Sequence, residues 1–94
     1  MYYVYILKST KDQRTYVGYC ENVARRLQDH NAGRVDATKR RRPLKLLYTE
    51  DAPTLAQAKM RERYWKSGGG RRKLRFFFEK GFPPSEAGRG SPTE

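Results

Sequence analysis

The chain has 94 residues, which suit one domain and leave no room for a second. Its net charge of +11 and its pI near 10.2 favour a polyanionic partner, either nucleic acid or an anionic membrane surface. No apolar run approaches the roughly 20 residues that cross a bilayer, so nucleic acid is the better interpretation and no membrane role is expected. The single cysteine, Cys20, excludes a disulfide framework, and with no signal-peptide pattern the sequence predicts a cytoplasmic protein.

The first third of the chain predicts two strands followed by a helix. Residues 2–8 and 15–20 are rich in β-branched and aromatic side chains, and the polar stretch between them suits a hairpin connection. The two strands are therefore expected to pair antiparallel. Asn22 is a good N-cap for a helix that is predicted to continue to about Asn31 and to end at Gly33.

A very basic loop at residues 34–42 separates this helix from a third predicted strand at residues 43–49. Side chains alternate along a strand, so we expect Leu44, Leu46 and Tyr48 to share one face. This strand would complete a small sheet.

The second half of the chain predicts one clear helix and a shorter one. Residues 54–57 have the form of a capping box, and they begin a helix expected to run to about Lys66. Three glycines at residues 68–70 are expected to break that helix, and residues 71–80 predict a short third one.

The order of these elements predicts an α+β fold, with a small three-stranded antiparallel sheet flanked by helices in the order β-β-α-β-α and a possible third helix. Residues 81–94 are rich in proline, glycine and serine and predict a disordered C-terminal tail. The folded domain is therefore assigned to residues 1–80.

Two tyrosines on neighbouring strands form the first candidate site. Tyr5 lies on one face of the first predicted strand, and Tyr16 and Gly18 share one face of the second. If these faces coincide, the two tyrosines lie close together beside an open patch at Gly18, where a ligand could approach. Tyrosines in strands are usually packing residues, so the pair alone does not establish catalysis.

Arg26 and His30 form a second candidate site on the first helix. They are four residues apart and fall together on the border of the apolar stripe made by Val23, Ala24 and Leu27. An arginine there could hold a phosphate, and the lone histidine could carry a proton near neutral pH. The alternative is an arginine that extends to solvent and a histidine that only packs at the boundary.

Glu62 is the third and most informative candidate. It projects from the sector of the second helix that also carries Ala58 and Trp65, and it is the only acid between Pro53 and Phe78. A carboxylate on an inward face is costly unless a charge or a metal compensates it. A hard divalent cation such as Mg²⁺ or Mn²⁺ would do so. The alternative is an ion pair on the helix surface with Lys66.

Basic side chains gather in two runs, and each is a candidate phosphate-binding surface. The second run also contains Lys73 and Arg75. The predicted nucleic-acid-binding residues are Arg34, Lys39, Arg40, Arg41, Arg42, Lys45, Lys66, Arg71 and Arg72.

The order of these motifs resembles the GIY-YIG nuclease domain, over roughly residues 1–75. The matching positions are Tyr3-Val4-Tyr5, Tyr16-Val17-Gly18, Arg26, His30-Asn31 and Glu62. The chain is most similar to the short stand-alone bacterial members, which are related to the N-terminal nuclease domain of a bacterial excinuclease. Tyr3 stands where the first motif has glycine, and Tyr19 stands where some relatives have lysine.

The resemblance implies roles for the matching residues. Tyr5 and Tyr16 would be the motif tyrosines, one of which helps to activate the attacking water. Arg26 would stabilise the phosphate, Glu62 would hold a single divalent metal, and His30 would lie where relatives carry histidine or tyrosine. Which tyrosine or histidine acts as the general base stays open.

These features together predict a metal-dependent endonuclease that hydrolyses phosphodiester bonds in DNA, in repair or recombination. The charge alone does not separate DNA from RNA, and the sequence leaves open a protein partner for target recognition and the oligomeric state. The alternative is a non-catalytic nucleic-acid-binding accessory module. A cationic structural protein is a third interpretation, and it explains the charge but not the set of tyrosine, arginine and glutamate residues.

Overall fold

The computed structural model describes residues 1–83, which form one sheet and three helices. In chain order the elements are β1 (Tyr2–Ser9), β2 (Thr15–Cys20), α1 (Val23–Asn31), β3 (Leu44–Ala52), α2 (Leu55–Lys66) and α3 (Gly68–Lys80). This order confirms the predicted α+β fold, the three antiparallel strands and the third helix.

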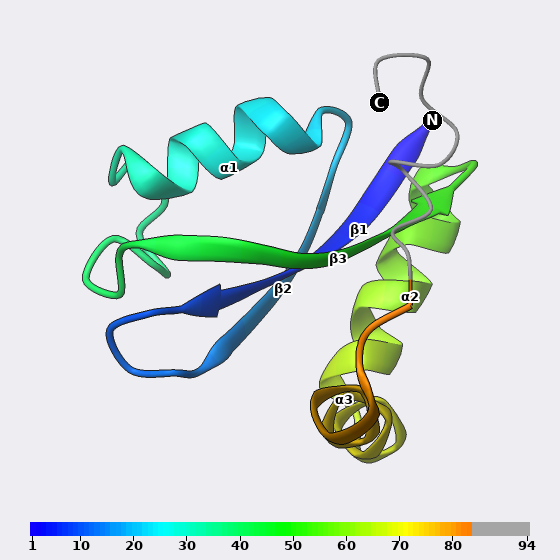
Figure 1. The fold of residues 1–94 in the computed structure, drawn as a ribbon. Coiled ribbons are helices and arrows are strands. Elements are labelled where there is room, and N and C mark those ends of the chain that lie inside the picture. The colour runs from blue at the N-terminus through cyan, green and yellow to red at the C-terminus, as the bar shows by residue number, and fades with distance from the viewer. Residues whose placement is uncertain (84–94) are drawn as a thin grey trace.

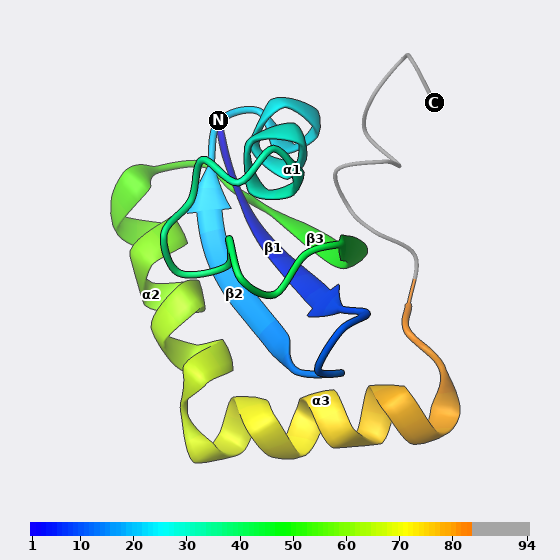
Figure 2. The same ribbon diagram turned by 90° about the vertical axis from the view of Figure 1, so that its left-hand side faces the viewer.

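The sheet has helices on both faces. β1 lies between β2 and β3 and pairs antiparallel with each. α1 covers one face, while α2 and α3 lie against the other (Figure 1). In the second view, α2 runs beside β2, and α3 runs past the end of the sheet where β1 turns into β2 (Figure 2). β2 is therefore an edge strand whose free side borders α2 and the start of α3.

Two layers of packed side chains lie on the two faces of the sheet. The larger core lies between the sheet and helices α2 and α3, and it includes Ile6, Trp65 and Phe77. A smaller cluster around Tyr5 and Leu7 lies on the α1 side. Strand side chains alternate, so β1 contributes its even-numbered residues to the large core and its odd-numbered residues to the α1 side.

β3 is longer than predicted and contains an irregularity that changes its faces. Ile6 of β1 lies opposite Tyr48. The next residue, Leu7, lies opposite Leu46, so the pairing shifts by one residue at Leu47. Such a β-bulge interrupts the alternation of side chains. The prediction that Leu46 and Tyr48 share a face is therefore wrong, because the bulge puts them on opposite sides of the sheet.

α1 and α2 begin at the predicted caps. The Asn22 side chain accepts a hydrogen bond from the backbone N–H of Arg25 at 3.0 Å, and the Thr54 hydroxyl accepts one from Gln57 at 3.1 Å. These local signals explain why the helix starts could be predicted from the sequence.

The glycines at residues 68–70 form the first turn of α3, whereas the sequence predicted that they separate two helices. Ser67 is the N-cap, and its hydroxyl accepts a hydrogen bond from the N–H of Gly70 at 3.4 Å. Gly70 is buried, and a Cβ atom there would overlap the backbone of Tyr64 and Trp65. The missing side chain thus lets α3 start directly against the end of α2.

The folded part continues past the boundary predicted at residue 80. The Phe82 ring packs against the larger core, with its centroid 5.3 Å from that of Phe77. Of the predicted tail, residues 84–94 lie outside the described residues. Within residues 1–83, no helix is long and apolar enough to cross a membrane.

Candidate active site

Tyr5 and Tyr16 lie together on the α1 face of the sheet, as predicted. The β1–β2 register pairs Tyr5 with Gly18 and Leu7 with Tyr16, and the two tyrosine rings are 6.3 Å apart between centroids. The patch at Gly18 is not open, because the Tyr5 ring covers it. A Cβ atom on Gly18 would lie 2.6 Å from the Tyr5 hydroxyl oxygen. Gly18 therefore provides the room that the Tyr5 ring occupies.

His30 connects the two tyrosines to the basic loop. Its Nε2 atom lies 2.9 Å from the Tyr5 hydroxyl, its Nδ1 atom lies 2.7 Å from the hydroxyl of Thr38, and its ring centroid is 5.1 Å from that of Tyr16. His30 was expected at the border of the apolar stripe, but it is fully buried. Helix periodicity could not show this burial, because the loop that carries Thr38 closes over the imidazole.

Arg26 orients the hydrogen bonds of this cluster. Its Nε–H donates a long hydrogen bond of 3.4 Å to the Tyr5 hydroxyl oxygen. Arginine can only donate, so the Tyr5 oxygen accepts this bond. The Tyr5 hydroxyl can then donate its own hydrogen bond to Nε2 of His30. In that arrangement Nδ1–H of His30 donates to the hydroxyl oxygen of Thr38.

Burial keeps Tyr5 and His30 neutral around pH 7. Only 1% of Tyr5 is exposed, and desolvation is the largest cause that raises its pKa to about 12, although the hydrogen bond from Arg26 opposes the rise. Desolvation also lowers the pKa of His30, and the nearby positive charge of Arg26 lowers it further. A neutral imidazole is the form that can accept a hydrogen bond from the Tyr5 hydroxyl at Nε2.

Asn31 and Thr38, which were not predicted as site residues, hold α1 and its loop in place. The Asn31 side chain donates to the backbone carbonyl of Leu44 at 3.0 Å and accepts from its N–H at 2.7 Å, which ties the end of α1 to β3. Thr38 is fully buried and contacts His30. A lone threonine in a charged loop gives no sequence signal of its own, whereas Asn31 is part of the motif that resembled the nuclease family.

Glu62 lies on α2, which packs on the opposite face of the sheet from α1. Its side chain is 25% exposed, and its carboxylate accepts a hydrogen bond from the ammonium of Lys66 at 3.1 Å. The prediction that Glu62 points inward without a surface ion pair is wrong, because four residues along α2 bring Lys66 to the same side. Glu62 remains partly accessible, and a pair of this kind is weak enough for a competing cation to replace.

Lys66 connects Glu62 to the tyrosines. A groove of about 300 Å³ follows the free edge of β2, and both Tyr16 and Lys66 line it. Its other lining residues come from β2, α2 and α3, namely Thr15, Val17, Trp65, Arg71 and Leu74. Tyr16 thus belongs both to the buried tyrosine–histidine cluster and to a surface that a large ligand can reach.

The residues around Glu62 fit a divalent cation that keeps most of its water. Residues 1–83 contain no group of three or more His, Cys, Asp or Glu side chains able to enclose a metal ion. Mg²⁺ characteristically uses one or two carboxylates and completes its shell with water and substrate phosphate oxygens. Glu62, a partly exposed carboxylate whose partner Lys66 lines the β2 groove, matches that donor set.

Glu50 is a second carboxylate near α2, and it was not predicted from the sequence. It is buried, receives hydrogen bonds from Arg61 at 2.7 and 3.2 Å, and accepts one from the indole N–H of Trp65 at 2.6 Å. With its oxygens engaged by these donors, Glu50 stabilises the contact between β3 and α2 and offers little to a metal.

Most of the predicted basic residues line hollows on the protein surface. Arg41, Lys66 and Arg71 line cavities beside β2 and α3. Lys39, Arg40 and Arg42 line a separate hollow near Asn31, and Lys45 lines a third beside Phe77 and Phe78. Arg34 forms an ion pair with Asp29 at 3.2 Å, and Arg72 lies beside Gly68 and Gly69.

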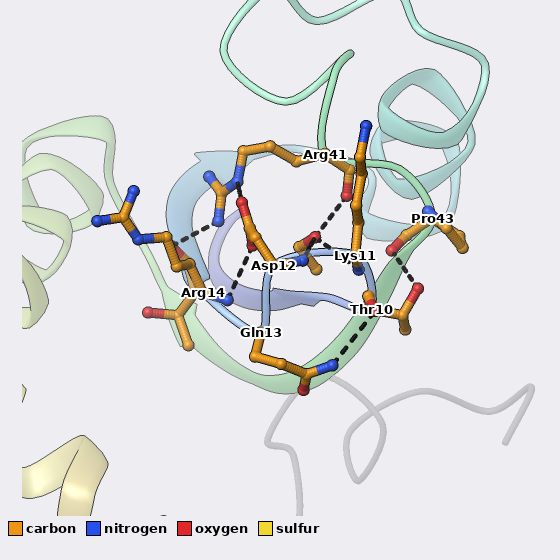
Figure 3. A network of polar contacts seen from close by, with 9 residues as sticks. Thr10, Lys11, Asp12, Gln13, Arg14, Arg41 and Pro43 are labelled. Carbon is orange, nitrogen blue, oxygen red and sulfur yellow. Dashed lines mark hydrogen bonds and ion pairs between the residues drawn. The ribbon is translucent and has the colours of Figure 1, made fainter.

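Arg41 brings the basic loop to the β1–β2 turn. Its guanidinium donates to the carboxylate of Asp12 at 2.9 Å and to the backbone carbonyl of Thr15 at 3.4 Å. Asp12 also accepts from the N–H of Arg14, so the turn and the loop form one polar network (Figure 3). This network holds the guanidinium of Arg41 on the side of the turn that faces α3.

Comparison with known proteins gives one consistent family. The model of the GIY-YIG catalytic domain matches residues 1–75. A UPF0213 protein of Staphylococcus haemolyticus is 40% identical over 80 residues, which cover 84% of this chain and 96% of that protein. A UPF0213 protein of Bacillus licheniformis is 38% identical, with 84% of this chain and 81% of that protein covered.

A solved structure agrees with this result. The solution NMR structure of a UPF0213 protein from Bacillus halodurans is similar, with a TM-score of 0.51 and 35% identity over 88% of this chain and 89% of that one. The family model spans the strands and helices that carry all five candidate residues, Tyr5, Tyr16, Arg26, His30 and Glu62. The chain therefore belongs to the GIY-YIG catalytic domain family, a family of the nuclease type.

Proposed function

We propose that the protein is a metal-dependent endonuclease that hydrolyses phosphodiester bonds in DNA. The observation that carries this proposal is the position of Tyr16, which contacts the Arg26–Tyr5–His30 cluster through His30 and also lines a groove with Lys66, the ion-pair partner of Glu62. Phosphate binding, proton transfer and cation binding each have a candidate side chain around that one tyrosine. Action in DNA repair or recombination and a cytoplasmic location belong to the same proposal, and the net charge of +11 supports the nucleic-acid substrate.

Arg26 is the residue that we assign to the scissile phosphate. Its Nε atom contacts Tyr5, and its two terminal nitrogens have no hydrogen-bond partner among residues 1–83. A guanidinium held at one nitrogen can present the others to two phosphate oxygens at once. The contact would strengthen as charge accumulates on the phosphate during attack.

Tyr16 is the tyrosine that we assign to the attacking water. Tyr5 is a poor base, because its pKa is about 12 and its hydroxyl is enclosed by Arg26 and His30. Tyr16 is only partly buried and reaches the groove. Tyr16 can contact a water molecule there, while the rings of Tyr5 and His30 pack against the Tyr16 ring.

Glu62 is the residue that would hold a divalent cation, with Mg²⁺ or Mn²⁺ as the candidates. When bound, such a cation neutralises charge on the phosphate and on the leaving oxygen. Lys66 would then be free to contact a neighbouring phosphate.

Cleavage of labelled DNA tests the proposal. Branched, flapped, linear and single-stranded DNA, with matching RNA, would be incubated with Mg²⁺, Mn²⁺ or EDTA. We expect metal-dependent cutting by the wild type, a loss of about a hundredfold or more in Tyr16→Phe, and near-normal cutting in the matched variant Tyr3→Phe. Equal cutting by the two variants would contradict the assignment of Tyr16.

The second candidate function is a binding module without cleavage. The ion pair between Glu62 and Lys66 favours it, because that pair satisfies the carboxylate without any metal. This alternative predicts tight, salt-sensitive binding by the wild type, no cutting of any substrate, and the same affinity in the presence of Mg²⁺ or EDTA.

A further inference from the structure

A second cavity lies between the β1–β2 turn and α3. Its volume is about 760 Å³, and four arginines line it. Arg14 and Arg41 come from the turn and the basic loop, and Arg71 and Arg75 come from α3. In the second view α3 passes below the β1–β2 turn, so the cavity is lined from two separate parts of the chain (Figure 2).

Most of this positive charge lacks a partner in the part of the chain that the structure describes. Arg41 is paired with Asp12 at 2.9 Å. Among residues 1–83, the guanidinium groups of Arg14, Arg71 and Arg75 form no ion pair or hydrogen bond, although one carboxylate, that of Glu79, also lines the cavity. Like charges gathered around one hollow repel each other, and an anionic ligand would relieve that repulsion.

Phe78 adds an exposed aromatic ring to the same cavity. The positions of Arg71, Leu74, Arg75 and Phe78 follow the helical spacing, so they share one face of α3. The Leu74 side chain is buried, whereas Phe78 is 46% exposed. The ammonium of Lys8 lies 5.5 Å from the Phe78 ring centroid, and a stacked base would replace this contact.

The cavity continues into the groove of the candidate active site. Thr15, Arg71 and Leu74 line both of them, and Tyr16 lies in the second. Arg71 and Phe78 are seven residues apart, which is about 10 Å along a helix and the length of a few nucleotides.

We propose that this arginine-lined cavity binds an unpaired strand of the substrate as it leaves the scissile phosphate, with a base stacked on Phe78. This inference rests on the nuclease function proposed above and adds the substrate class. The bases of a duplex are stacked on one another, so only an unpaired base can present its face to an aromatic side chain. The arginines hold the phosphate backbone of that strand. Stacking on Phe78 favours single-stranded over double-stranded nucleic acid.

Binding measured in EDTA tests this proposal without any cleavage. Fluorescence anisotropy would compare a short labelled single strand with a duplex of the same sequence. We expect Phe78→Ala to weaken single-strand binding about tenfold and to leave duplex binding unchanged. Phe76→Ala is the matched control, because Phe76 is 54% exposed on the same helix and lines none of the cavities described. We expect it to change affinity by less than about twofold.

A second pair of variants tests the charges. Arg75→Gln and Lys80→Gln remove the same charge from the same helix, but only Arg75 lines the cavity. We expect Arg75→Gln to reduce the slope of log affinity against log salt for the single strand by about 0.7, and Lys80→Gln to leave it unchanged. Equal slopes for the two variants would contradict a role of the cavity in holding the strand.

The outcomes separate this proposal from the nuclease itself. Equal single-strand affinity for Phe78→Ala and Phe76→Ala would overturn the strand-binding cavity, even if the wild type cuts DNA. Equal loss of single-strand and duplex binding in Phe78→Ala would also overturn it. A wild type that binds a single strand through Phe78 but cuts no substrate would retain the strand-binding cavity and overturn the nuclease.

Discussion

The Tyr5 ring lies across the face of Gly18, directly opposite it in the β1–β2 pairing. A Cβ atom on Gly18 would come within 2.6 Å of the Tyr5 hydroxyl oxygen and 2.7 Å of its Cζ atom. Tyr5 cannot move aside, because it is buried and hydrogen-bonded to His30. The lack of a side chain at Gly18, on the edge strand β2, thus gives the Tyr5 ring the space that it occupies.

Gly18→Ala should therefore disturb both the fold and the site. We expect its free energy of unfolding to fall by about 1–3 kcal/mol, the usual cost of overpacking, as measured by urea denaturation. Gly68→Ala is the control, because its nearest neighbour would be the flexible Arg72 side chain at 3.6 Å, and we expect a change within about 0.5 kcal/mol. A Gly18→Ala protein as stable as the wild type would show that Tyr5 moves easily.

The charge of Glu50 should matter for the stability of the protein and not for cleavage. Glu50→Gln weakens the hydrogen bonds from Arg61 and Trp65 in a buried place, so we expect a loss of about 1–3 kcal/mol in the free energy of unfolding. At low temperature, where the variant stays folded, its cleavage should be near normal. Loss of cleavage without loss of stability would show that Glu50 belongs to the catalytic site.

His30 should make the protein less stable in mild acid. Its folded pKa is below the ordinary value of about 6.5, so the unfolded chain binds more protons between those two values. The contribution of His30 to stability is full above pH 6.5 and is lost as the pH falls toward the folded pKa. Asp12, whose pKa is also lowered, loses its contribution only below its ordinary value of 3.8.

The measurement for His30 is the slope of unfolding free energy against pH between about 5 and 7. We expect a positive slope in the wild type and a flatter one in His30→Gln. His30 is the only histidine in the chain, so NMR can follow its titration without overlap. An imidazole that titrates at or above its ordinary pKa would contradict the buried, neutral state.

Lys66 should compete with a metal for Glu62. The ammonium lies 3.1 Å from the carboxylate, so its removal frees the ligand and also removes a repulsive charge. We expect Lys66→Gln to bind Mn²⁺ about two- to fivefold more tightly than the wild type without nucleic acid. Lys73→Gln makes the same charge change on α3 and should leave Mn²⁺ affinity unchanged. Weaker binding in Lys66→Gln would indicate that Lys66 supports the metal site.

The parts of the fold that could be predicted have local causes. Runs of β-branched and aromatic residues indicated β1 and β2, and the caps Asn22 and Thr54 marked the starts of two helices. The closeness of Tyr5 and Tyr16 followed from the same alternation, since one hairpin contains both.

The features that were missed depend on contacts far apart in the sequence. The bulge at Leu47 arises in the pairing of β1 with β3, and the burial of His30 requires the loop after α1 to fold back over the imidazole. Glu50 is stabilised by donors on α2. Helix periodicity alone cannot rank the contact of Glu62 with Lys66 against an inward-pointing carboxylate, because both fit the same spacing.

A single-turnover cleavage assay of Glu62→Gln tests the central claim most directly. Labelled DNA would be mixed with an excess of the wild type, of Glu62→Gln or of the charge-matched control Glu21→Gln, with Mg²⁺ or with EDTA. Glu21 is exposed and lines none of the cavities described. We predict metal-dependent cleavage by the wild type and the control, and a rate at least about a hundredfold lower in Glu62→Gln with unchanged DNA binding. Full metal-dependent cleavage by Glu62→Gln would contradict the assignment of Glu62 as the residue that holds the cation.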